Sequence, residues 1–404
     1  MKTFNFATQS LLVFLSSCLP QDDEEIFRYF FNKNCNLFIF LHLLKKLTTM
    51  KTLILPFLFL LTFLISCKTD DMEVVEKKVA SVDLYVAGIE NNQACYWKNN
   101  VKTNLINGTG ITAKKIIVEN NDVYVFAINN VAPFDYYLWK NNNRINVNQY
   151  IGTNINTSNP TDYNHNVNDF LIDQGNIYLF GSIRSPITYS PSTGINSYTR
   201  EICYWKNGVK TVLFTENPPF LLTNITTRNT TIHNGDIYIP VNKRFNNLTD
   251  SPIEIGYFIN GTYHIVLPYS NQTSFRHISK GTNSVYLSIY DQSINKTYYK
   301  NLLTNTDSYF SQTVKGKFTC DGNDIYDFSN GQNYLKNDLT IFSNYSSGFD
   351  NIEDLLAINQ NVYQIRSKIV NDKKESYKVY INDTEVQQIN VLHGIFTSLF
   401  VVPN

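Results

Sequence analysis

Short runs of alternating apolar and polar residues fill the chain from residue 82 to its end. KKIIVEN at 114–120 and VKTVLF at 209–214 are two such runs, and Asn, Gly and Asp residues separate one run from the next. Side chains of a β-strand alternate between two faces, so a period of two with turn residues between the runs is typical of strands. The pattern predicts an all-β region over 82–404.

Two short phrases recur along this region at a spacing of about 46 residues, a period typical of repeat proteins. One stretch, QACYWKNNVKTNL at 93–105, returns nearly unchanged as EICYWKNGVKTVL at 201–213. The first phrase centres on a tyrosine: Tyr85, Tyr124, Tyr178, Tyr238, Tyr286, Tyr326 and Tyr363. The second contains an asparagine: Asn99, Asn141, Asn207, Asn260, Asn301, Asn337 and Asn382. Because both phrases occur in phase, they predict seven structural repeats.

Each repeat is predicted to contain four strands, A to D. Strand A ends in a turn of Gly, Asn or Asp, strand B contains the tyrosine, and the asparagine lies in the turn between strands C and D. Two-residue hairpin turns need positive φ at their central positions, which Asn and Gly tolerate best. We therefore interpret the seven asparagines as structural turn residues. A ring of ligand-binding asparagines is the alternative.

Tandem four-stranded units of this length resemble the blades of a β-propeller, in which neighbouring blades cover each other's faces around a ring. The first repeat begins with strand B (VDLYVAG, 82–88), and the chain ends in a strand A (SLFVVPN, 398–404). We therefore expect the last strand to join the first repeat and to complete its four-stranded blade. The signatures of WD and kelch repeats are missing, and a propeller fold alone does not define a function.

Residues 50–66 have a lysine near the start, then a long apolar run, which is the pattern of a bacterial export signal. Leu64-Ile65-Ser66-Cys67 resembles the lipobox of bacterial lipoproteins. That resemblance implies cleavage before Cys67, lipidation of its sulfur and acylation of the new amino terminus, which together anchor the protein in a membrane. An uncleaved membrane anchor is the alternative.

A complete signal after Met50 predicts that translation begins there and that residues 1–49 are an over-extended N-terminus. A start at Met1 is the alternative, because Leu15-Ser16-Ser17-Cys18 also fits a lipobox. With the start at Met50 and cleavage before Cys67, residues 67–81 are predicted to be the lipidated cysteine and a charged tether. The chain resembles a loosely defined set of bacterial propeller lipoproteins, a resemblance that implies little about function. With the lipobox we expect an outer-membrane lipoprotein of the cell envelope, either periplasmic or surface-exposed; Lys68-Thr69-Asp70-Asp71 is similar to the short acidic signal that sends some lipoproteins to the outer cell face.

Charge and motifs exclude several function classes. Lys+Arg and Asp+Glu number 34 each, so the basic surplus of a nucleic-acid binder is missing and no nucleic-acid partner is expected. No nucleophile elbow, phosphate-binding loop or zinc helix occurs, so neither cofactor nor metal is predicted. TCDGNDIYD at 319–327 is similar to a calcium loop but lacks its closing Glu, and we interpret it as an A–B turn. Cys95, Cys203 and Cys320 are expected to be unpaired, buried thiols.

The long insertions of the repeats all fall between strands B and C or between strands D and A. They cover 148–166, 182–199, 214–229 and 242–252. In a propeller these connections lie on one face, and loops on a rigid scaffold are where binding tends to occur. The insertions carry aromatic and arginine side chains that suit a glycan or a protein surface: Tyr150, Tyr163, Arg184, Tyr189, Tyr198, Phe220, Arg228, Arg244 and Phe245. The alternative is that these side chains only order the loops.

Three functions remain open on this basis. The first is a lipid-anchored binding or scaffold module of the cell envelope that holds a glycan or protein ligand on its looped face. The second is a glycan-degrading hydrolase or lyase with carboxylates at the propeller funnel, for which Asp162, Asp169 and Asp250 are candidates. The third is a purely structural envelope lipoprotein. The sequence does not single out any pair of carboxylates, so the first function is favoured.

Overall fold

The computed structural model describes the part of the chain that begins at residue 81. The described ranges are 81–129, 135–152, 164–186, 188–190, 195–216, 229–244, 253–270, 272–310, 316–328, 331–341, 348–390 and 392–404. Residues 79–404 form one compact unit. No helix within the described ranges is both long and apolar enough to cross a membrane. The predictions for 1–49, 50–66 and 67–80, including Cys67, lie outside the described residues and stay predictions.

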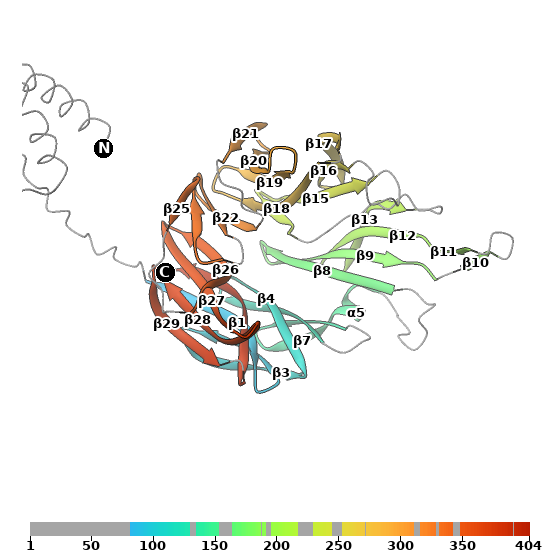
Figure 1. The fold of residues 1–404 in the computed structure, drawn as a ribbon. Coiled ribbons are helices and arrows are strands. Elements are labelled where there is room, and N and C mark those ends of the chain that lie inside the picture. The colour runs from blue at the N-terminus through green and yellow to red at the C-terminus, as the bar shows by residue number, and fades with distance from the viewer. Residues whose placement is uncertain are drawn as a thin grey trace, which may run out of the picture. The chain divides into compact units, whose positions relative to one another are not determined.

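Seven four-stranded antiparallel sheets follow one another around a ring, which confirms the predicted seven-bladed β-propeller (Figure 1). We number the sheets as blades 1 to 7 and name their strands A to D from the ring centre outward. Blade 1 consists of β30 (Gly394–Pro403), β1 (Val82–Glu90), β2 (Gln93–Lys98) and β3 (Val101–Thr109). Blade 2 consists of β4 (Ile111–Glu119), β5 (Asp122–Asn129), β6 (Tyr136–Lys140) and β7 (Asn143–Asn146). Blade 3 consists of β8 (Asn164–Asp173), β9 (Asn176–Arg184), β12 (Arg200–Lys206) and β13 (Val209–Glu216).

The remaining four blades follow in chain order. Blade 4 consists of β14 (Thr231–His233), β15 (Asp236–Arg244), β16 (Ile253–Ile259) and β17 (Thr262–Ser270). Blade 5 consists of β18 (Thr273–Lys280), β19 (Val285–Asp291), β20 (Lys296–Asn301) and β21 (Thr306–Tyr309). Blade 6 consists of β22 (Lys317–Asp321), β23 (Asp324–Phe328), β24 (Tyr334–Lys336) and β25 (Leu339–Ile341). Blade 7 consists of β26 (Asn351–Ile358), β27 (Asn361–Val370), β28 (Lys373–Ile381) and β29 (Thr384–Asn390).

The two ends of the compact unit close the ring, as expected from the sequence. β30 pairs with β1 along its length, from Val82 opposite Pro403 to Glu90 opposite Gly394. Each A strand then contacts the A strands of both neighbouring blades, so that β30, β4, β8, β14, β18, β22 and β26 form a closed circle. Blade 1 is therefore built from both ends of the unit, and β30 covers the edge of β1 that faces the ring centre.

Apolar side chains between neighbouring blades make up the core. The tyrosine of strand B faces the next blade: Tyr85 packs in one cluster with Trp139 of blade 2, and Tyr124 packs in another with Trp205 of blade 3. All four side chains are almost completely buried. Burying one such large side chain contributes roughly 1.5–3 kcal/mol, so each blade depends on its neighbours for most of its stability.

The turn asparagines have the backbone geometry that was expected, with one exception. Six of them occupy the first central position of a two-residue turn with φ between 45 and 50°: Asn99, Asn141, Asn207, Asn260, Asn337 and Asn382. The two-residue turn is absent from blade 5, where residues 302–305 join strands C and D. There Asn301 ends β20, and its Oδ1 accepts hydrogen bonds from the backbone N–H groups of Leu303 and Thr304 at 3.0 and 3.4 Å.

The six asparagines also bind their own blade through their side chains. In blade 2 the Asn141 N–H donates to the Val123 carbonyl at 2.9 Å, and Asn141 Oδ1 accepts the Val123 N–H at 2.8 Å. Asn141 Nδ2 donates to Asp122 at 2.5 Å, and Lys140 pairs with the same carboxylate at 2.8 Å. The equivalent contacts of the asparagine recur in blades 1, 3, 4, 6 and 7. We call this recurring arrangement the turn lock.

The three cysteines of the ring are unpaired, as expected, but they are not equally buried. Cys95 and Cys203 are fully buried on equivalent strands of blades 1 and 3. Cys320 is only partly buried, contrary to the expectation, because it lies near the end of β22 beside the short turn at Gly322. Burial raises the pKa of each thiol to about 12, so all three stay protonated at neutral pH.

Candidate functional site

The two faces of the ring differ in the length of their connections. Across the described blades the A–B and C–D turns contain two residues, except in blade 5, where they contain four. We call the face that carries them the short-turn face. The B–C and D–A connections lie on the opposite, looped face, where blade 3 adds a separate hairpin of β10 (Thr188–Ser190) and β11 (Ile195–Ser197). This hairpin projects outward from the blade (Figure 1).

Two of the nine candidate ligand residues come together at the looped end of blade 3. Arg184 ends β9, and its guanidinium lies 5.3 Å from the ring centroid of Tyr198 in the B–C insertion. Beside them Arg200 forms a bidentate pair with Glu216, with N–O distances of 2.6 and 2.9 Å. Because the side chain of Glu216 is only 3% exposed, this pair holds the loop ends of strands C and D together.

Tyr150 lies elsewhere. It ends the short helix α5 (Val147–Tyr150), which packs through Val147 and Ile151 between blades 2 and 3. The Tyr150 carbonyl lies against Gly208 in the C–D turn of blade 3, where a Cβ atom would approach it to 2.6 Å. Burial raises the pKa of the Tyr150 hydroxyl to about 12. The prediction that Tyr150 lies on the looped face is therefore wrong: the D–A connection of blade 2 begins beside a C–D turn, at the short-turn side, because α5 packs there through Val147 and Ile151.

The side chains of the other candidates lie outside what the structure describes. Tyr189 is in β10 and Arg244 ends β15, and the structure describes only their backbone. Tyr163, Phe220, Arg228 and Phe245 lie outside the described residues. Their proposed contacts with a ligand stay predictions.

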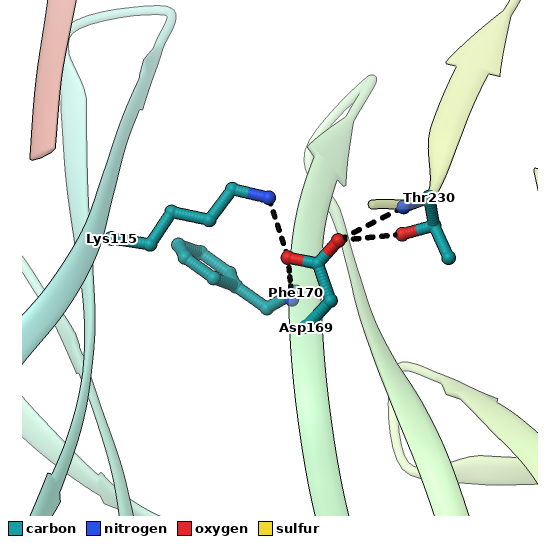
Figure 2. Close-up of polar contacts among 4 residues, drawn as sticks. All are labelled: Lys115, Asp169, Phe170 and Thr230. Atoms are coloured by element: carbon teal, nitrogen blue, oxygen red, sulfur yellow. Dashed lines mark hydrogen bonds and ion pairs between the residues drawn. The ribbon is translucent and has the colours of Figure 1, made fainter. Parts of the chain in front are cut away.

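Asp169, one of the three candidate carboxylates, is a buried connector between three blades (Figure 2). It lies on β8, and its Oδ1 accepts hydrogen bonds from Lys115 Nζ at 2.6 Å and from the Phe170 N–H at 2.9 Å. Its Oδ2 accepts from the N–H and the hydroxyl of Thr230 at 3.1 and 2.9 Å. Lys115 belongs to blade 2, and Thr230 directly precedes strand A of blade 4. All of the carboxylate's strong acceptor sites are therefore in use.

Asp354 makes the corresponding contact at the closure of the ring. It lies on β26, and its Oδ2 accepts the N–H of Leu399 on β30 at 3.0 Å. In both cases a carboxylate on one A strand binds the N–H at the inner edge of the next A strand, which has no strand partner there. The two aspartates thus satisfy backbone groups of neighbouring blades.

Asp169 and Asp354 occupy the same register position on their A strands, and all seven blades have a polar residue there. We call these residues the inner ring: Ser398, Lys115, Asp169, Asn229, His277, Lys317 and Asp354, in blade order. In five blades a β-bulge directly precedes the position. Sequence reasoning missed this ring, although in blades 2 to 7 its members stand nine residues before the tyrosine of strand B.

The arrangement does not form a general acid and base pair. Asp169 is saturated with donors, and Asp354 holds a backbone N–H, so neither carboxylate is placed for work on a substrate. Asp162 and Asp250, the other two candidates, lie outside the described residues. Within the described part of the chain, no three His, Cys, Asp or Glu side chains group as ligands for a metal ion. The TCDGNDIYD segment forms the end of β22, a turn and β23, as expected.

A groove of about 610 Å³ lies on the short-turn face. It lies between the turns of blades 1 and 2, and its lining includes Tyr85, Lys98, Asn99 and Asn141. Both asparagines are engaged in turn locks, and Lys98 pairs with Asp83 at 2.6 Å while lying over the Tyr85 ring. These four side chains are committed to the fold.

The comparisons with known proteins concern the fold. No protein-family model and no curated protein matches the sequence. Among solved structures, a puromycin-hydrolysing peptidase of Mycobacterium tuberculosis is 8% identical with a TM-score of 0.45, over 77% of this chain and 53% of that chain. An acylaminoacyl peptidase of Pyrococcus horikoshii is 10% identical with a TM-score of 0.43, over 76% and 52%. BamB from Moraxella catarrhalis is 10% identical with a TM-score of 0.38, over 69% and 87%. This chain thus spans about half the length of the two peptidases that it resembles.

Proposed function

We propose that this protein is a lipid-anchored binding or scaffold module of the bacterial cell envelope, and that its looped face holds a glycan or protein ligand. The difference between the two faces carries the proposal. Turn locks and short hairpins hold the short-turn face, whereas the long B–C connection of blade 3, with its β10–β11 hairpin, belongs to the other face. Loops on a rigid ring are free to supply contacts without a loss of fold stability.

The ends of the compact unit lie on the face opposite the proposed ligand contacts. Ser81 precedes β1, and its carbonyl accepts the Asn404 N–H at 3.0 Å, so both ends lie together at blade 1. β1 begins beside the C–D turn, where the Leu84 N–H donates to Asn99 at 2.8 Å. Ser81, the first described residue, therefore lies at the short-turn face, opposite the face of the proposed ligand contacts.

The contacts of the described carboxylates favour binding over hydrolysis. A glycosidase needs two carboxylates flanking one bond with room for a water molecule or a nucleophile. Asp169 is instead enclosed by Lys115, Phe170 and Thr230. The pair of Arg184 and Tyr198 presents a cation and an aromatic ring, a combination common in binding surfaces.

A glycan array probed with the purified protein tests the binding function. Binding without product release is expected, and exchange of Tyr198 for Ala should weaken it about tenfold or more, because one aromatic contact is lost. Lys98→Ala on the short-turn face is the control, with unchanged binding expected. Release of shortened glycans would overturn the proposal in favour of an enzyme. If no glycan on the array binds, protein ligands are sought by affinity capture, and the same two variants are compared.

The anchor has its own test. Cys67→Ala should move the protein from the membrane fraction to the soluble fraction and abolish labelling with a fatty-acid analogue. Cys18→Ala is the control and should change neither. If labelling depends on Cys18 instead, the start at Met1 is correct.

A further inference from the structure

Two members of the inner ring are lysines, and they are differently engaged. The side chain of Lys115 is 33% exposed, and one of its three N–H donors binds Asp169. Lys317 is exposed at the start of β22, and within the described ranges it has no ion pair and no side-chain hydrogen bond. Two ammonium groups thus retain unused donors on the inner strands of blades 2 and 6.

The two lysines act on the same pair of neighbours from different blades. Both lower the pKa of His277 in blade 5, although burial is the larger cause of its fall to about 3. Both also oppose the rise of the Asp354 pKa that burial produces in blade 7. Charge effects on one group weaken with distance and with screening. Lys115 and Lys317 also stand at the same register position on two A strands of one closed circle, so both extend from the same level of the ring.

The unused charged donors among these residues are those of the two lysines. His277 stays neutral at pH 7 and its Nδ1 is buried without a partner among the described residues. Asp169 is saturated, and Asp354 already binds the Leu399 N–H. A group with several anionic oxygens would supply the missing acceptors through charge-assisted hydrogen bonds.

The site faces the loops. The A strands of blades 4 and 6 are short: Asn229 stands two residues before β14, and Lys317 is the first residue of β22, at the end of each strand that follows its D–A connection. The inner ring is therefore reached from the looped face at these two blades. We propose that the inner ring binds an oxyanion, a carboxylate or phosphate group, between Lys115 and Lys317.

Calorimetric titration of the purified protein with inorganic phosphate and with citrate tests the site. Lys317→Gln should weaken binding about tenfold or more, since it removes a charged donor from the anion. Lys373→Gln removes the same charge from an exposed lysine on blade 7 and should change the affinity less than twofold. Equal loss in both variants, or no binding of either anion to the unaltered protein, overturns the site. An unchanged melting temperature of Lys317→Gln without ligand verifies that the variant is folded.

Two further arms identify the source of the anion. A galacturonate trimer that binds more tightly than its methyl ester, with the advantage lost in Lys317→Gln, indicates a carboxylate on a ligand of the looped face. Equal binding of acid and ester, together with phosphate binding that depends on Lys317, indicates a free small anion. Both results support the inner ring as the site. The proposed function fails separately, if neither a glycan nor a protein binds while phosphate does.

Discussion

Asn382 combines a backbone conformation that its turn requires with two side-chain hydrogen bonds to the neighbouring strand. Its backbone adopts a φ of 45°. Its Oδ1 accepts the Val362 N–H at 2.8 Å, and its Nδ2 donates to Asn361 at 2.6 Å. Glycine would supply the backbone conformation without the side-chain contacts, and most other residues would supply neither. The combination explains why asparagine rather than glycine stands first in these turns.

Asn382→Ala should lower the free energy of unfolding by about 2–4 kcal/mol. The alanine is strained at positive φ, and the Val362 N–H loses its partner in a mostly buried place. Asp383→Gly is the matched control at the second turn position, where φ is 70° and two other blades have glycine, and its effect should stay within about 0.5 kcal/mol. Urea denaturation of both variants gives the comparison. A loss in Asn382→Ala no larger than in the control would contradict the turn lock.

Asn382 and Lys317 also mark how far the sequence predicts the structure. The turn could be predicted because positive φ is a local demand that few residue types meet. The side-chain contacts of Asn382 could not, since they depend on a strand some twenty residues away in the chain. The inner ring escaped notice because its members share a register and not a residue type, and lysine, aspartate and histidine there look unrelated until the A strands are aligned. The roles of the loop residues stay predictions for a similar reason: insertions have no repeat to align.

At the scale of elements, β30 has a role that no other A strand has. It is the strand that pairs the C-terminal end of the compact unit with β1, and it buries Phe396, Leu399 and Val401. The Ile395 carbonyl lies where a Cβ atom on Gly88 would stand, so the fit of β30 on β1 is close. A break between two other neighbouring strands of the ring would leave them connected through the chain, whereas a break between β30 and β1 would open the ring.

Deletion of residues 395–404 should unfold the domain. The loss of three buried side chains at roughly 1.5–3 kcal/mol each is similar to the whole stability of a typical domain. Removal of Asn404 alone deletes only its contacts with Ser81 and should cost less than about 1 kcal/mol. Circular dichroism melting of the two truncations distinguishes them. A shortened protein that still melts cooperatively near the original temperature would show that the ring holds without this strand.

At the scale of the whole molecule, blade interfaces bury ionisable groups that oppose each other in their pH dependence. Asp327 faces blade 5 from the strand B position that is apolar in five other blades, and burial raises its pKa to about 8. Burial lowers the pKa of His165 to about 4 and of His277 to about 3. The folded protein thus keeps a proton on Asp327 that the unfolded chain releases, and it lacks protons on both histidines that the unfolded chain binds in acid.

The stability should therefore be greatest near pH 6.5. Between the histidines' ordinary pKa of 6.5 and about pH 4, the unfolded chain binds two protons at the histidines and the folded state one at Asp327, so stability falls as the pH drops. Above pH 6.5 the folded state keeps the proton of Asp327 that the unfolded chain releases, and stability falls as the pH rises toward 8, by about 1.4 kcal/mol per pH unit and proton.

Asp327→Asn removes the titrating group and nearly keeps its shape. Its stability should stay level between pH 6.5 and 8, and it should fall more steeply than that of the unaltered protein toward pH 4, because both histidines then act unopposed. Asp372→Asn, on an exposed turn, should leave the profile as it is. Denaturant midpoints measured from pH 4 to 8 give the three curves. Parallel curves for all three proteins would mean that Asp327 is not held protonated, and that water reaches the interface of blades 5 and 6.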